Sequence, residues 1–114
     1  MGGGIESLNF ALTFAVELAA IAGYGFWGYS LGRTPQTKWL LAALLVGVII
    51  GFWALFFAPT AQHRLPARLG VPLSGVIFLL GSLGYYLAGK PAFAFVLAAA
   101  AIINRILAWL WAQW

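Results

Sequence analysis

One residue of this sequence with a side chain suited to chemistry is an acid, Glu17, which lies inside a long apolar run. The run covers residues 7–31, and ~20 residues at a rise of ~1.5 Å each are enough to cross a bilayer. Asn9 and Thr13 precede Glu17 at intervals of four residues, so all three fall on one side of a helix. An ionised carboxylate in hydrocarbon needs a partner or water. This polar face therefore predicts either contacts that hold helices together or a path for a proton or substrate.

The partner that the sequence offers to Glu17 is Arg105, in the last apolar run. In an up-down bundle the first and last helices are neighbours, and these two side chains lie at about the same depth and lean toward each other. We therefore predict an intramembrane ion pair between Glu17 and Arg105. In the alternative arrangement, Arg105 reaches the headgroups and leaves Glu17 protonated. The predicted intramembrane polar cluster has five members: Asn9, Thr13, Glu17, Asn104 and Arg105.

Other reactive residue types are scarce. The chain has no cysteine, one histidine and two acidic residues, so it offers no nucleophile–base pair, no carboxylate pair within one segment and no credible metal site. His63 has no second ligand nearby, which favours a place at headgroup level over metal or pigment binding. We expect no enzyme activity, no catalytic residue, no metal and no cofactor.

The composition indicates a membrane protein. Hydrophobic residues make up 64% of the 114 positions and charged residues 7%, whereas ordinary globular domains carry ~25% charged residues. The six basic residues are scattered, so the net charge of +4 favours contact with lipid headgroups over nucleic-acid binding. The expected location is the cell membrane, with several spans embedded in lipid.

Three connections divide the chain into four apolar segments, which predict an all-α, integral membrane four-helix bundle of up-down topology. The whole chain, 1–114, is expected to form a single transmembrane domain. Trp109, Trp111 and Trp114 predict an interfacial belt at the end of the last helix. The expected helices are at about 7–31, 38–58, 69–88 and 91–112.

The second helix carries small residues at four-residue spacing, namely Ala43, Gly47 and Gly51. Such a ridge allows the backbone of another helix to approach closely. We expect the second helix to pack through this ridge.

Three stretches together resemble the YrdB-like family: SLNFALTFAVELAAIAGYGFWGY, FFAPTAQHRLP and IINRILAWLW. The resemblance covers nearly the whole chain, and its motifs are apolar runs punctuated by Asn9, Glu17, Pro59 and Asn104. It implies a small four-span prokaryotic membrane protein of unknown function, and it implies no activity.

Two functions remain open. The first, which we expect, is a non-catalytic protein that acts through helix packing, as an accessory or structural subunit of a larger membrane complex or by self-association. The second is a dimeric proton-coupled small-molecule transporter in which Glu17 exchanges the proton, similar to the small multidrug resistance exporters in size and layout only. If Arg105 neutralises Glu17 permanently, transport is excluded.

The orientation is nearly balanced by the positive-inside rule. We expect both termini in the cytoplasm, because the connection 59–68 is the longest and the densest in cationic groups. Arg105 adds to the terminal side only if it is exposed. The basic residues are Arg64 and Arg68 on the terminal side, and Arg33, Lys38 and Lys90 on the other.

Overall fold

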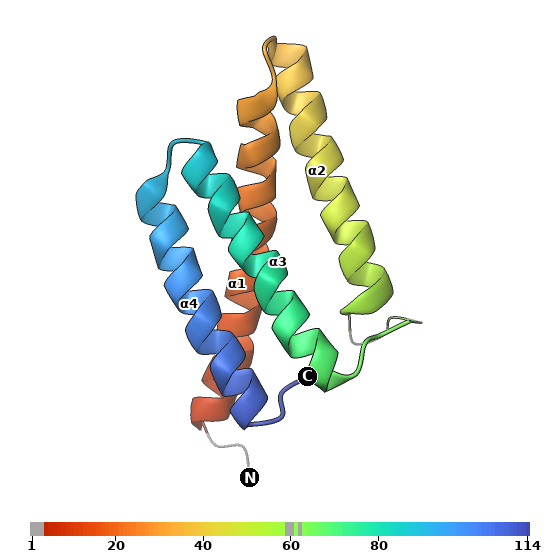
Figure 1. Cartoon of the computed structure of the whole chain (residues 1–114), viewed down its shortest axis with the longest axis vertical. Helices are drawn as coiled ribbons and strands as arrows, with labels where there is room; N and C mark the ends of the chain where they lie inside the picture. The colour runs from red at the N-terminus through yellow and green to blue at the C-terminus, as the bar shows by residue number, and fades with distance from the viewer. Residues whose placement is uncertain (1–3, 59–60, 62) are drawn as a thin grey trace.

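The computed structural model describes residues 4–58, 61 and 63–114; Pro59 of the family motif lies outside these residues. The described residues form the expected all-α four-helix bundle (Figure 1). Both termini are at the same end of the bundle, as the up-down topology requires (Figure 1). Every helix is long and apolar enough to cross a membrane, as in a multi-pass membrane protein. The helices are α1 (Gly4–Leu31), α2 (Pro35–Phe56), α3 (Ala67–Leu87) and α4 (Pro91–Leu110).

The helix α2 begins three residues earlier than predicted, because Pro35 belongs to the helix rather than to the connection. Thr34 is the N-cap: its hydroxyl accepts a hydrogen bond from the Thr37 backbone N–H at 3.2 Å, and the Thr34 N–H donates to the Thr37 hydroxyl at 2.9 Å. Proline suits the first helical position, where its missing N–H would have had no partner within the helix.

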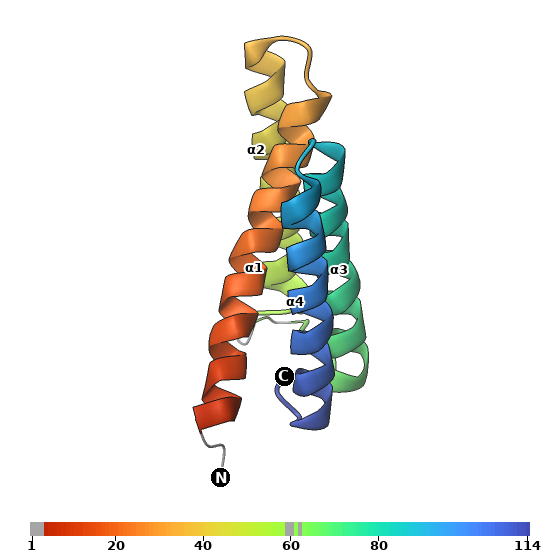
Figure 2. The ribbon, with the colours of Figure 1, turned by 90° about the vertical axis from the view of Figure 1, so that its left-hand side faces the viewer.

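The helix α1 is the centre of the bundle. It contacts α2, α3 and α4, and α3 contacts α4, whereas α2 makes its main contacts with α1 alone. Figure 2 shows that α1 runs at an incline to α3 and α4 and that the α1–α2 hairpin extends beyond the α3–α4 turn. Ala42 is the one buried residue of α2, and most of the other residues of this helix are exposed.

The prediction that α2 packs through its small-residue ridge is wrong within this chain. Ala43, Gly47 and Gly51 are exposed, and a Cβ atom added to either glycine would meet nothing within 4 Å. The reason is the rotation of the helix: Ala42, one position away, turns toward α1 and packs against Gly28 there.

The close approach that small residues allow occurs instead between α1 and α3. Gly23 lies directly against the backbone of Gly81, and a Cβ on Gly81 would be 2.9 Å from the carbonyl oxygen of Ala20. Two tyrosines also connect α1 and α3 at this contact. The hydroxyl of each donates a hydrogen bond to a backbone carbonyl of the opposite helix. Tyr24 bonds to Ile77 at 2.8 Å, and Tyr85 bonds to Ala19 at 2.7 Å.

Candidate functional site

The structure brings four of the five predicted cluster residues together between α1 and α4, near the end of the bundle that carries the termini. Asn104, which is fully buried, donates from its amide nitrogen to Asn9 Oδ1 at 2.9 Å and to Thr13 Oγ1 at 2.7 Å. Thr13 in turn donates to the backbone carbonyl of Asn9, one turn earlier, at 2.9 Å. These contacts join two helices whose residues are far apart in the sequence.

Arg105 points into this cluster and not toward the headgroups. It is 9% exposed, and three of its nitrogens donate hydrogen bonds: Nε to Asn104 Oδ1 at 2.9 Å, Nη1 to Ser74 Oγ at 3.0 Å and Nη2 to Thr13 Oγ1 at 3.1 Å. Its guanidinium also lies 5.2 Å from the centre of the Phe78 ring, within the range of a cation–π contact. Every one of these groups is neutral, so the cation is held by hydrogen bonds rather than by an opposite charge.

The predicted ion pair between Glu17 and Arg105 does not form as a direct salt bridge, because no nitrogen of Arg105 lies within 4.0 Å of a Glu17 carboxylate oxygen. The two charges still interact electrostatically through space. The cause of the separation is helical drift. Four residues turn an α-helix through ~400°, so a side chain eight positions on is rotated by ~80°. Asn9 and Thr13 therefore face α4, whereas Glu17 has turned toward α2 and α3.

Glu17 is half-buried beside a small cavity of about 10 Å³ that α1 shares with α2 and α3. The walls are apolar and include Trp53 and Phe78. Among the described residues, no side chain donates a hydrogen bond to the Glu17 carboxylate. Phe78 lies between this cavity and the polar cluster, because its ring lines the cavity and also contacts Arg105.

Sequence reasoning missed two members of the cluster. Ser74, on α3, accepts from Arg105 and donates to the Val71 carbonyl at 2.8 Å. Gln113, beyond α4, accepts from the Asn9 amide and donates to the Glu6 carbonyl at 3.0 Å. Comparing the depth of polar residues on the third apolar segment with that of Arg105 would have found Ser74. No sequence pattern indicated Gln113.

The chain end after α4 turns back onto the bundle, with Ala112 in the left-handed region at φ 52°. Trp114 then donates its indole N–H to the Leu65 carbonyl at 2.7 Å and lies flat against Gly70. The Arg64 guanidinium is 4.3 Å from the Trp114 ring centre. Trp114 is therefore half-buried against the bundle, while Trp109 remains exposed.

His63 is exposed in the connection that follows α2. In the part of the chain that the structure describes, no three histidine, cysteine or acidic side chains come together.

A family model described as a protein of unknown function (DUF2568) matches residues 11–102. This match includes Thr13 and Glu17, and it ends just before Asn104. No curated protein and no solved structure matches the chain significantly.

Proposed function

This chain belongs to the DUF2568 family of unknown function, and within that family we propose that it is a non-catalytic membrane protein that acts through helix packing. In this proposal it is an accessory or structural subunit of a larger membrane complex. The YrdB-like resemblance fits the same class of small four-span prokaryotic proteins. The observation that supports the proposal is the position of α2, which packs mainly on α1 and leaves Ala43, Gly47 and Gly51 open.

Two exposed glycines spaced four apart on an otherwise large-residue helix form a shallow depression into which a helix of another chain can fit. The polar cluster supports the same role. Its hydrogen bonds tie α1, α3 and α4 into one unit, and this unit would hold α1 in place as the support for α2.

A substitution on the open ridge tests this proposal. We expect tagged wild-type protein, extracted from its own membranes in mild detergent, to elute as an assembly with co-purifying chains. Gly47→Leu should elute as the single chain with unchanged helix content, because leucine fills the depression without touching the bundle. Ile50→Leu, a change without added volume on the same helix, should assemble like the wild type. A wild-type protein that elutes alone, or Gly47→Leu that assembles normally, would contradict the proposal.

One observation favours a second function, a dimeric proton-coupled transporter of small molecules. Glu17 makes no direct salt bridge with Arg105 and lies beside a cavity between α1, α2 and α3, so among the described residues no cation is in direct contact with its carboxylate. For this function, Glu17→Gln should abolish the uptake of a cationic dye into proteoliposomes driven by a pH gradient. Glu6→Gln removes the only other acid, in the first turn of α1, and should leave uptake unchanged. No uptake by the wild type above empty liposomes would exclude the transporter.

We propose that both termini face the cytoplasm, on the strength of the cationic connection 59–68. The burial of Arg105 removes it from the count of surface charges, so Arg64 and Arg68 alone oppose the three basic residues of the other side. A C-terminal reporter that is active only in the cytoplasm should give a signal. A signal from an externally active reporter alone would reverse the orientation, and equal signals from both would indicate dual insertion.

A further inference from the structure

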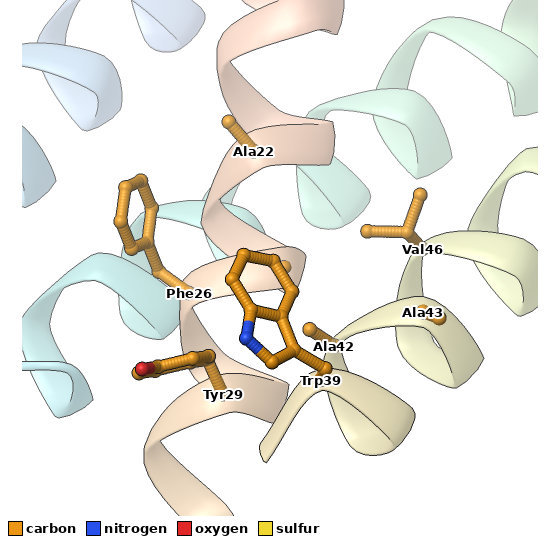
Figure 3. A pocket seen from close by; sticks show the side chains of 8 residues that line it. Ala22, Phe26, Tyr29, Trp39, Ala42, Ala43 and Val46 are labelled. Carbon is orange, nitrogen blue, oxygen red and sulfur yellow. The ribbon is translucent and has the colours of Figure 1, made fainter. Parts of the chain in front are cut away.

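An open apolar groove lies between α1 and α2. It has a volume of about 540 Å³, within the range of ~300–1,000 Å³ that small-molecule sites occupy. Figure 3 shows Phe26 and Tyr29 on α1 and Trp39 on α2 around it. Small residues leave its floor hollow. The lining residues are Ala22, Gly25, Phe26, Tyr29, Trp39, Ala42, Ala43 and Val46.

Two lysines each lie over an aromatic ring that lines the groove. The Lys38 Nζ lies 5.1 Å from the centre of the Tyr29 ring, and the Lys90 Nζ lies 5.0 Å from the centre of the Phe26 ring. Phe26 and Tyr29 are three residues apart, and thus neighbours on one face of α1. The two ammonium groups, which come from different helical hairpins, therefore contact neighbouring rings that line the same groove.

This end of the bundle has positive charge without negative charge. Arg33 stands in the α1–α2 connection, on the same side as the α3–α4 turn that carries Lys90 (Figure 1). The only acids of the chain are Glu6, at the other end of α1, and Glu17, which is about one and a half turns before Ala22 and about two and a half turns before Phe26. A second copy of the chain in parallel would bring the same three cations to this place, which disfavours self-association here.

We infer that the groove binds an anionic phospholipid, with an acyl chain along its apolar floor and the phosphate between Lys38 and Lys90. Basic groups beside an apolar cleft between transmembrane helices are the combination that anionic lipid headgroups require. The Trp39 ring packs edge-on against Tyr29 at 5.3 Å, and both rings lie where headgroup and acyl chain meet. The groove shares only Ala43 with the proposed protein-binding ridge of α2, so the two sites are separate.

Native mass spectrometry of the purified full chain tests this inference, with phosphatidylglycerol and phosphatidylcholine of identical acyl chains as probes. A basic side chain at the membrane surface contributes roughly fivefold to binding an anionic lipid, so Lys38→Gln with Lys90→Gln should lower affinity for phosphatidylglycerol by roughly 30-fold. Arg68→Gln removes an exposed charge at the opposite end and should leave the affinity unchanged. Ala22→Phe fills the groove without altering charge and should weaken the binding of both lipids.

Equal wild-type affinity for the two lipids would overturn the inference. So would an Arg68→Gln variant that loses as much preference as the double lysine variant, because the effect would then follow net charge and not the groove. Unchanged binding by Ala22→Phe would exclude an acyl chain in the groove, as would a tightly bound protein segment found there in place of lipid. If the double variant does not fold, each single lysine variant carries the same test, with an expected loss of roughly fivefold.

Discussion

Replacing Gly81 with leucine should separate α1 from α3 and lower the free energy of unfolding of the purified chain by roughly 3 kcal/mol, the upper end of what overpacking costs. A Cβ atom at this position would already lie 2.9 Å from the Ala20 carbonyl oxygen and 3.0 Å from its Cα. These are backbone atoms, so no change of rotamer relieves the clash. The hydrogen bonds of Tyr24 and Tyr85 cross the same contact and would lengthen with it.

The matched control for this variant is Gly47→Leu, the same substitution on the open face of α2. Nothing lies within 4 Å of a Cβ there, so the denaturant midpoint of the separated chain, measured by circular dichroism in detergent, should not fall below the value of the separated wild-type chain. Equal shifts of the midpoint in both variants would mean that α1 and α3 do not approach as closely as described.

Replacing Asn104 with leucine should destabilise the chain by roughly 2–4 kcal/mol, because it leaves buried polar groups without partners. The Nε of Arg105 loses its acceptor and Asn9 Oδ1 loses its donor. Ile103→Ala, on the exposed side of the same helix, should cost much less. The unfolding midpoint of the purified protein in detergent measures both variants.

Adding Arg105→Met to Asn104→Leu should recover the part of that loss that comes from Arg105, while Asn9 Oδ1 stays without its donor. When both partners of a buried polar contact become apolar, no unsatisfied charge remains. Thr13 and Ser74 stay satisfied, because each still donates to a carbonyl of its own helix. A double variant that is less stable than Asn104→Leu would show that Arg105 contributes through contacts other than those with Asn104.

The sequence was sufficient to predict the bundle and most of the polar cluster. Four apolar runs long enough to span a bilayer leave few alternatives to four packed helices. Depth along antiparallel helices placed Glu17 level with Arg105, and four-residue spacing placed Asn9 and Thr13 on the same side of the first helix. The structure joins Asn9 and Thr13 to Asn104 and Arg105 and leaves Glu17 outside these hydrogen bonds. Depth depends only on residue counts and helix rise, and both can be read from the sequence.

The direction in which each side chain points was harder to predict. Glu17 turned away from Arg105 because four-residue spacing drifts around the helix, and Ala42 rather than Ala43 faces α1 because one residue is ~100° of rotation. In lipid, an apolar residue gives no signal of which side it faces, since both sides are apolar. Rotation is set by the close contacts of Gly23, Gly28 and Gly81, which depend on the pairing of distant segments.

The polar cluster joins residues from opposite ends of the sequence, so its members are synthesised at different times. The hydrogen-bond partners of Asn9 are synthesised much later: Asn104 follows it by 95 residues and Gln113 by 104 residues. At ~5–20 residues per second, the first helix leaves the ribosome ~5–20 s before these partners exist. During that interval its amide and hydroxyl groups must be sheltered, by the membrane insertion machinery or by water at the bilayer edge. α1 is thus made before α4, and its Asn9 side chain gains its partners only when Asn104 and Gln113 have been added, so a chain truncated before Asn104 would leave Asn9 without both of them.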